Sequence, residues 1–179
     1  MIGFHEGTQS TASKVSESEE AIAAGATELD VVINRTQVQA GDYVAVWEEL
    51  SAIRQVSPVQ KVILKLILET SQLSREEIVA ASVVAGYAGF DYIKTSTGFF
   101  GRGASEEDVQ LMGRVASLVG EQLGKEKMKV KASGGVRTLG DAKTMLDAGA
   151  ERIGASAGVA IVQDFLAQRG AERGDGNGY

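Results

Sequence analysis

The sequence predicts an α/β fold in which short parallel strands alternate with helices along one domain of 179 residues. Three observations lead to this prediction. Apolar runs of strand length recur along the chain, segments of helical period separate them, and small residues close a helix just before three of the strands, in AGATELD, AGFDYIK and AGAERIG. A strand followed by a helix, repeated, implies a parallel sheet with right-handed crossovers.

Five segments have the length and apolar content of buried strands. In chain order they are TELDVVIN (27–34), KVILKLILE (61–69), FDYIKTS (90–96), KMKVKAS (127–133) and the short AERIGAS (150–156). Each begins about one strand–helix unit after the previous one, which favours a (β/α) barrel. A doubly wound open sheet is the alternative, but it normally carries a GxGxxG turn after its first strand, and no strand here is followed by one.

The intervening segments place apolar residues three and four apart, as amphipathic helices do. They are residues 13–26, 40–56, 74–89, 105–124 and 138–150. Two of them open with a helix start signal. Ser74 stands three residues before Glu77, and Ser105 stands three residues before Asp108, and both spacings are close to those of a capping box.

Composition excludes several classes of function. The net charge of -6 and the pI near 4.9 argue against a nucleic-acid-binding protein, because affinity for phosphate backbones comes from clustered Lys and Arg. The chain has no cysteine and one histidine, His5, so neither a thiolate nor a His-rich metal site is expected. No apolar run approaches the roughly 20 residues that span a bilayer. The first residues also lack the order of a signal peptide, so we expect a cytoplasmic protein.

The two faces of each strand carry different side chains, because side chains alternate along a strand. In residues 61–69, Lys65 lies on one face, and the opposite face is apolar. The apolar face consists of Val62, Leu64, Leu66 and Leu68. The same alternation in the neighbouring strands places Asp30, Lys94 and Lys131 on the side of Lys65. Four successive strands therefore direct a charged residue toward one common axis.

Lys94, taken alone, is more simply explained as a solvated charge at a strand end. Several charges buried together are costly unless they pair or act chemically. A lysine becomes a nucleophile when its amine is neutral, and both burial and a neighbouring cation lower its pKa. Lys131 would supply that cation. With the carboxylate of Asp30 nearby, the group indicates carbonyl chemistry through a Schiff base.

Two glycine-containing turns near the end of the chain form a candidate phosphate site. KASGGVRT places Gly134 and Gly135 directly after the fourth strand, and RIGASAG places Gly154 and Ser156 directly after the fifth. In barrels, the loops after the last two strands commonly hold phosphate through backbone N–H groups. Either loop alone is equally well explained as a tight turn, and the two together favour phosphate.

The motifs TELDVVIN, KLILET, DYIKTSTGF, VKASGGVRT and RIGASAG, in this order, resemble those of the 2-deoxy-D-ribose-5-phosphate aldolase family, which are class I aldolases with a (β/α)8 barrel. The resemblance implies that Lys94 forms the Schiff base, Lys131 lowers its pKa, and Asp30 relays protons through water. It also places Lys65 and Thr95 in the substrate site. The residues that it implies hold the sugar phosphate are Gly134, Gly135, Gly154 and Ser156.

The reaction that this resemblance implies is reversible cleavage of 2-deoxyribose 5-phosphate to glyceraldehyde 3-phosphate and acetaldehyde, in deoxyribonucleotide catabolism. No metal or other cofactor is implied, because the protonated imine is the electron sink. A complete barrel has about 250 residues, and this sequence begins where the family's third strand would end. We therefore expect a TIM (β/α)8-type barrel without its first two strands and most of the third.

This partial barrel is expected to span residues 1–170, followed by a flexible tail at 171–179. Tyr179, at the end of the tail, either aids proton transfer, as a terminal tyrosine does in some family members, or belongs to a disordered end. An incomplete barrel has two open sheet edges, which a homodimer would cover.

Two other functions stay open at this point. One is a catalytically inactive barrel that binds sugar phosphates or associates with its own kind. The other is a phosphate-binding isomerase or synthase without a Schiff base, for which Glu69 is the obvious strand-end base. Only the pair of lysines separates the aldolase from both.

Overall fold

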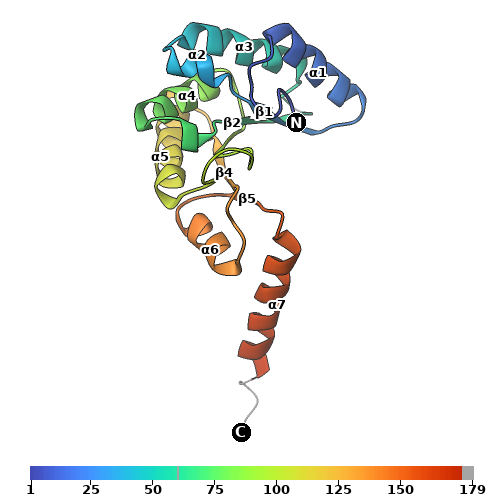
Figure 1. Cartoon of the computed structure of the whole chain (residues 1–179), viewed down its shortest axis with the longest axis vertical. Helices are drawn as coiled ribbons and strands as arrows, with labels where there is room; N and C mark the ends of the chain where they lie inside the picture. The colour runs from blue at the N-terminus through green and yellow to red at the C-terminus, as the bar shows by residue number, and fades with distance from the viewer. Residues whose placement is uncertain (60, 175–179) are drawn as a thin grey trace.

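The computed structural model describes residues 1–59 and 61–174, and its strands form one parallel sheet with helices packed along the outer face (Figure 1). The strands are β1 (Glu28–Val32), β2 (Ile63–Ile67), β3 (Tyr92–Lys94), β4 (Lys129–Ser133) and β5 (Arg152–Gly154). Each lies inside a segment that the sequence predicted as a strand, so the α/β prediction is confirmed.

The order of the strands decides between the two candidate architectures. All neighbouring pairs are parallel and follow chain order, β1-β2-β3-β4-β5. A doubly wound sheet reverses its strand order at a switch point, whereas a barrel wall adds each strand beside the previous one. The described sheet therefore has the order of a barrel wall.

The sheet is curled, so that side chains from its two outermost named strands meet. Arg152 on β5 forms an ion pair with Glu28 on β1. Beyond β1, Ile2 adds one parallel bridge to Val31, and the backbone N–H of Ile2 donates to the carbonyl of Asp30 at 2.8 Å. Ile2 thus pairs with the outer edge of β1. The resemblance to the aldolase family predicts the end of the third barrel strand at this position.

The five predicted helices are all present. They are α1 (Thr11–Ala23), α3 (Tyr43–Val56), α4 (Arg75–Tyr87), α5 (Glu106–Leu123) and α6 (Leu139–Asp147). Ser74 and Glu77 form a complete capping box at the start of α4. Ser105 accepts a hydrogen bond from the backbone N–H of Asp108 at the start of α5.

Three further helical segments were not predicted. They are α2 (Arg35–Gln39), the 3-10 turn η1 (Thr70–Gln72) and α7 (Gly158–Gly174). The first two are too short to show a helical period in the sequence. Glycine has low helix propensity, and α7 contains Gly158, Gly170 and Gly174, which explains why its pattern is weak.

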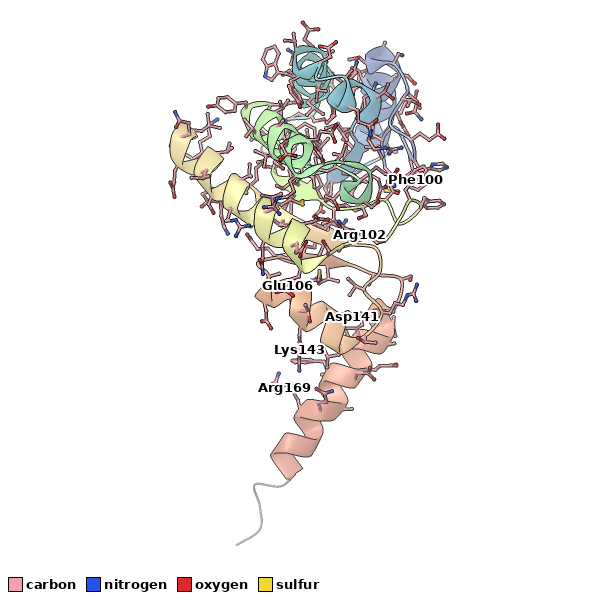
Figure 2. All side chains as sticks on the ribbon, turned by 60° about the vertical axis from the view of Figure 1, so that its left-hand side comes forward. Phe100, Arg102, Glu106, Asp141, Lys143 and Arg169 are labelled. Carbon is pink, nitrogen blue, oxygen red and sulfur yellow. The ribbon has the colours of Figure 1, made fainter. Side chains whose placement is uncertain are left out.

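Helix α7 projects away from the rest of the molecule (Figures 1 and 2). It packs mainly against α6, and four of its apolar side chains are exposed. They are Val159, Val162, Phe165 and Leu166. Residues 171–174, where the tail was expected to begin, form the last turn of this helix. Residues 175–179, including Tyr179, lie outside the described residues.

The hydrophobic core lies between the sheet and the helices. The apolar face predicted for β2 is buried there, since Leu64, Leu66 and Leu68 have no exposed surface and Val62 is almost fully covered. Each fully buried side chain of this size contributes about 1.5–3 kcal/mol to folding. This packing directs the opposite face of β2, with Lys65, toward the inner side of the curled sheet.

One ion pair is buried inside this outer layer. Lys14 of α1 donates from Nζ to Glu49 Oε1 of α3 at 2.6 Å and to the carbonyl of Val32 at 3.0 Å. Both side chains are almost fully buried. Burial lowers the pKa of Lys14 and raises that of Glu49. The pair joins two helices to the carboxyl end of β1, two residues beyond Asp30.

Replacing Lys14 with methionine is expected to destabilise the fold by about 3–5 kcal/mol, because the buried Glu49 carboxylate loses its counter-charge. Urea unfolding measures this loss. The double variant Lys14→Met with Glu49→Leu is expected to recover most of it, since an apolar pair can replace a buried ion pair. Equal losses in the single and double variants would show that side-chain shape, not charge, governs this contact.

None of the described helices combines the length and the apolar character that a membrane-spanning segment requires.

Candidate active site

Asp30 is the centre of a charged cluster on the inner face of the sheet. Its Oδ2 accepts hydrogen bonds from Lys94 Nζ and Lys131 Nζ, each at 2.7 Å, and its Oδ1 lies 3.0 Å from Lys65 Nζ. The four residues come from β1, β2, β3 and β4. The structure therefore brings together all four residues that the strand alternation directed to a common axis.

Lys94 is the last residue of β3 and only 5% of it is exposed. Burial lowers the pKa of Lys94 below its ordinary value; Asp30 opposes this effect and Lys131 adds to it. The amine therefore becomes neutral at a lower pH than a solvated lysine. Burial alone would raise the pKa of Asp30, but hydrogen bonds from Lys131 and Lys94 lower it well below its ordinary value, so the carboxylate is charged at neutral pH.

Glu28 is a second carboxylate of the cluster, and sequence reasoning missed it. Its Oε2 lies 2.7 Å from Lys65 Nζ and also pairs with Arg152. Hydrogen bonds from Arg152 and Lys65 lower the pKa of Glu28 to about 2. The signal was present, since Glu28 stands two residues before Asp30 and so shares its face. Lys65 is thus held between two carboxylates, whereas Lys94 contacts one.

Replacing Lys131 with methionine is expected to raise the pKa of Lys94, because Lys131 is one of the groups that lower it. The pH at which Lys94 reacts with an aldehyde then moves upward, and imine formation at neutral pH becomes slower. The rate of borohydride trapping, measured against pH, reports this shift. Lys129→Met, an exposed position on the same strand, serves as the control, and a downward shift in Lys131→Met would contradict the prediction.

The loops after β4 and β5 lie side by side at the carboxyl end of the sheet, the end at which Lys94 also lies. Gly134 and Gly135 follow β4 with φ of 80° and 77°, a conformation that favours glycine. The backbone N–H of Gly134 donates to the carbonyl of Gly154 at 3.4 Å. Ser156 follows in the exposed turn before α7. The hydrogen bond places Gly134 beside Gly154, the last residue of β5, and Gly135 and Ser156 lie in the turns that follow the two strands.

Gly154 and Thr95 also have structural roles. A Cβ at position 154 would lie 2.8 Å from Ser133 Oγ and 3.2 Å from Lys131 Cε, so glycine leaves room for the Lys131 side chain. Thr95 is fully buried. Its Oγ1 donates to the carbonyl of Ser133 at 2.9 Å and accepts from the Ser133 N–H at 3.0 Å. The Thr95 hydroxyl therefore joins the ends of β3 and β4.

The β3–α5 loop, residues 95–105, packs against the glycine turn that follows β4. A Cβ at Gly103 would lie 2.5 Å from the carbonyl carbon and oxygen of Gly134, and the N–H of Ala104 donates to that oxygen at 3.0 Å. Figure 2 shows Phe100 and Arg102 on this loop. Gly134 therefore serves as a packing surface for the loop as well as part of the candidate phosphate site.

Together these groups provide a buried amine, a charged carboxylate and open glycine turns at one end of the sheet. Such a set suits covalent carbonyl chemistry on an anionic substrate. Across residues 1–59 and 61–174, no three or more His, Cys, Asp or Glu side chains are placed to hold a metal ion. Tyr179 lies beyond the part of the chain that the structure describes.

Comparison with known proteins gives a consistent result. A family model described as DeoC/LacD family aldolase matches residues 2–164. The chain is 49% identical over 164 residues to a deoxyribose-phosphate aldolase of Coccidioides immitis, covering 92% of this chain and 59% of that protein. It is 45% identical over 169 residues to one of Caldanaerobacter subterraneus, covering 94% of this chain and 70% of that protein.

A solved structure gives the same result for the fold. The tetrameric deoxyribose phosphate aldolase of Aeropyrum pernix is 32% identical and superposes with a TM-score of 0.81, covering 93% of this chain and 67% of that one. The chain thus spans 59% of the length of the Coccidioides relative and 70% of the Caldanaerobacter one. The residues that the family model matches include the whole charged cluster and both glycine turns.

Proposed function

Because the chain belongs to the DeoC/LacD family of aldolases, we propose that it cleaves 2-deoxy-D-ribose 5-phosphate reversibly to glyceraldehyde 3-phosphate and acetaldehyde, as a class I aldolase. The observation that carries this proposal is the buried amine of Lys94, 2.7 Å from Asp30 and adjacent to Lys131. Burial and Lys131 lower the pKa of this amine, which favours the neutral form that attack on a carbonyl requires.

The proposed reaction begins when the neutral amine of Lys94 attacks the C1 aldehyde of the open-chain sugar. Loss of water leaves a protonated imine. Asp30 is the nearest carboxylate to this nitrogen, and it remains charged because hydrogen bonds from Lys131 and Lys94 lower its pKa. We assign to Asp30 the transfer of protons, through water, to and from the groups that react at this lysine.

The carbon–carbon bond breaks in the next step. Loss of the C3 hydroxyl proton drives cleavage of the C2–C3 bond, and the bonding electrons move into the iminium to form an enamine. Glyceraldehyde 3-phosphate leaves, and its aldehyde carbon is the former C3 of the sugar. The enamine then takes a proton at C2, and hydrolysis of the imine releases acetaldehyde and restores the Lys94 amine. The protonated imine is the electron sink, so the proposal includes no metal or cofactor.

The phosphate of the substrate is assigned to the turns after β4 and β5. Gly135 and Ser156 are exposed there, and because glycine has no Cβ, an anion can approach the backbone N–H groups closely. The start of α7 at Gly158 adds the positive end of a helix dipole close to the same turns. Lys65 and Thr95 complete this proposed site, Lys65 through the charged cluster and Thr95 by joining β3 to β4.

We also propose a cytoplasmic protein of deoxyribonucleotide catabolism that associates as a homodimer. The support for association is the apolar surface that α7 exposes at Val159 and Leu166, together with the outer edge of β5, which pairs only with β4 among the described strands. Unpaired strand edges and apolar patches favour association with another chain. Nucleic acid and membrane are not among the proposed partners.

Borohydride trapping tests the proposed function. The chain is incubated with acetaldehyde or with 2-deoxyribose 5-phosphate, reduced, and analysed by peptide mass mapping. A two-carbon adduct on Lys94 after acetaldehyde treatment would support the Schiff base. A folded chain that binds 2-deoxyribose 5-phosphate but forms no adduct would instead be the catalytically inactive barrel that the sequence left open.

A further inference from the structure

Glu69 is a buried acid that the proposed reaction does not use. It lies just beyond β2 and has no exposed surface. Its backbone adopts a left-handed conformation, with φ 57° and ψ 59°, which residues with a side chain rarely adopt. Such conformations persist where surrounding contacts maintain them, and they concentrate at functional sites. The contacts of Glu69 therefore require a functional explanation.

The carboxylate of Glu69 binds the β3–α5 loop at its beginning. Oε2 accepts hydrogen bonds from the backbone N–H of Thr97 at 3.0 Å and from the Thr97 hydroxyl. That hydroxyl in turn accepts from the N–H of Phe99 at 3.1 Å. A charged acceptor shared by two donors makes stronger hydrogen bonds than a neutral one. Glu69 therefore holds the three residues from Thr97 to Phe99 in one arrangement.

The same burial argues against Glu69 as a general base. Its Oε2 is engaged by Thr97, its Oε1 is buried without a hydrogen-bond partner among the described residues, and the side chain is completely covered. A base must come within hydrogen-bonding reach of the proton that it removes from the substrate. This placement weighs against the isomerase or synthase alternative, in which Glu69 would be that base.

The turn that contains Glu69 is fastened directly to the strand that ends in Lys94. The N–H of Leu68 donates to the carbonyl of Lys94, and the N–H of Thr70 donates to that of Thr95, each at 2.9 Å. Ser71 Oγ adds a hydrogen bond to the carbonyl of Phe100 at 3.3 Å. The residues that follow β2 thus hold the first half of the β3–α5 loop through several contacts. These contacts lie next to Lys94, the proposed nucleophile.

The second half of the loop is held from the other side. Ala104 donates to the carbonyl of Gly134, and Gly103 touches the backbone of the same residue. The loop therefore spans the distance between Glu69 and the glycine turn proposed to bind phosphate.

We propose that Glu69 is a positioning residue that, through Thr97, sets the β3–α5 loop against the phosphate-binding turn at Gly134. This inference rests on the proposed function of the site. Glu69 acts on how the phosphorylated substrate is held, and not on the reactivity of the Lys94 amine. Loss of its charge is therefore expected to weaken binding of 2-deoxyribose 5-phosphate while Lys94 still captures free acetaldehyde.

The test compares Glu69→Gln with Glu48→Gln, the same chemical change at an exposed position of α3. For Glu69→Gln we expect KM for 2-deoxyribose 5-phosphate to rise about tenfold, because a neutral amide replaces a charged acceptor of two donors. The kcat and the rate of borohydride trapping with acetaldehyde are expected to stay within about twofold of the unchanged chain. Glu48→Gln is expected to alter none of these.

Thr97 provides a second pair of variants. Thr97→Val removes the hydroxyl that donates to Glu69 and is expected to reproduce the rise in KM. Thr97→Ser keeps a hydroxyl at this position, so its KM is expected to stay close to that of the unchanged chain. If Glu69→Gln leaves KM unchanged, or lowers acetaldehyde trapping as much as cleavage, the positioning role is wrong.

Hydrogen exchange separates this inference from the proposed function. Amides of residues 97–103 are expected to exchange about tenfold faster in Glu69→Gln than in the unchanged chain, because the anchor of the loop is weakened. If the unchanged chain captures no acetaldehyde, the aldolase proposal fails, and exchange still decides whether Glu69 holds the loop. Unaltered exchange in both Glu69→Gln and Thr97→Val would overturn the role of Glu69.

Discussion

Replacing Lys94 with alanine is expected to lower kcat/KM for 2-deoxyribose 5-phosphate by about four orders of magnitude or more, since no imine can form at that position. The other amines of the cluster are poor substitutes. Lys65 lies within 3.0 Å of both Glu28 and Asp30, so its amine is already held by two carboxylates. Production of glyceraldehyde 3-phosphate, followed with a coupled dehydrogenase, measures the loss.

The matched control for this variant is Lys129→Ala. Lys129 shares the inner face of β4 with Lys131, two residues nearer the start of the strand, and is exposed, so its removal is expected to leave activity within about twofold. Mass mapping after reduction shows which lysine reacts. An adduct that persists in Lys94→Ala and maps to Lys131 would assign the nucleophile to Lys131 and refute the proposed roles.

Replacing Gly103 with alanine is expected to destabilise the fold by about 3 kcal/mol and to raise KM for the phosphorylated substrate by about tenfold or more. The new Cβ would lie 2.5 Å from backbone atoms of Gly134 and 2.9 Å from the N–H nitrogen of Gly135. Backbone cannot move aside as a flexible side chain can, so the loop and the glycine turn must separate. Urea unfolding and steady-state kinetics measure the two effects.

Gly41→Ala isolates the steric part of this prediction. Gly41 has φ of 72°, close to the 77° of Gly103, but a Cβ there would meet no atom within 4 Å. It is expected to cost only the backbone strain of about 1–2 kcal/mol, with kinetics unchanged. Equal destabilisation by the two variants would show that backbone strain, and not the contact with Gly134, accounts for the effect at Gly103.

The strands and the charged cluster were predictable because their signals are local. Alternation along β2 separates Leu64 and Leu66 from Lys65 within a few residues, and the same rule places Asp30, Lys94 and Lys131 on the inner side. By contrast, α2 and η1 are too short for a period to appear, and the glycines of α7 weaken its pattern. The same alternation places Glu28, the first residue of β1, on the face of Asp30.

The α/β class, the faces of the strands and the residue types that meet at the inner axis follow from strand period and side-chain alternation, which need no knowledge of distant contacts. Which atoms pair depends on the folded chain. The ion pair between Glu28 and Arg152, the shared oxygen of Asp30 and the hold of Glu69 on Thr97 all join segments far apart in the chain. Their distances depend on how the sheet curls and how its loops pack, and no local pattern encodes those quantities.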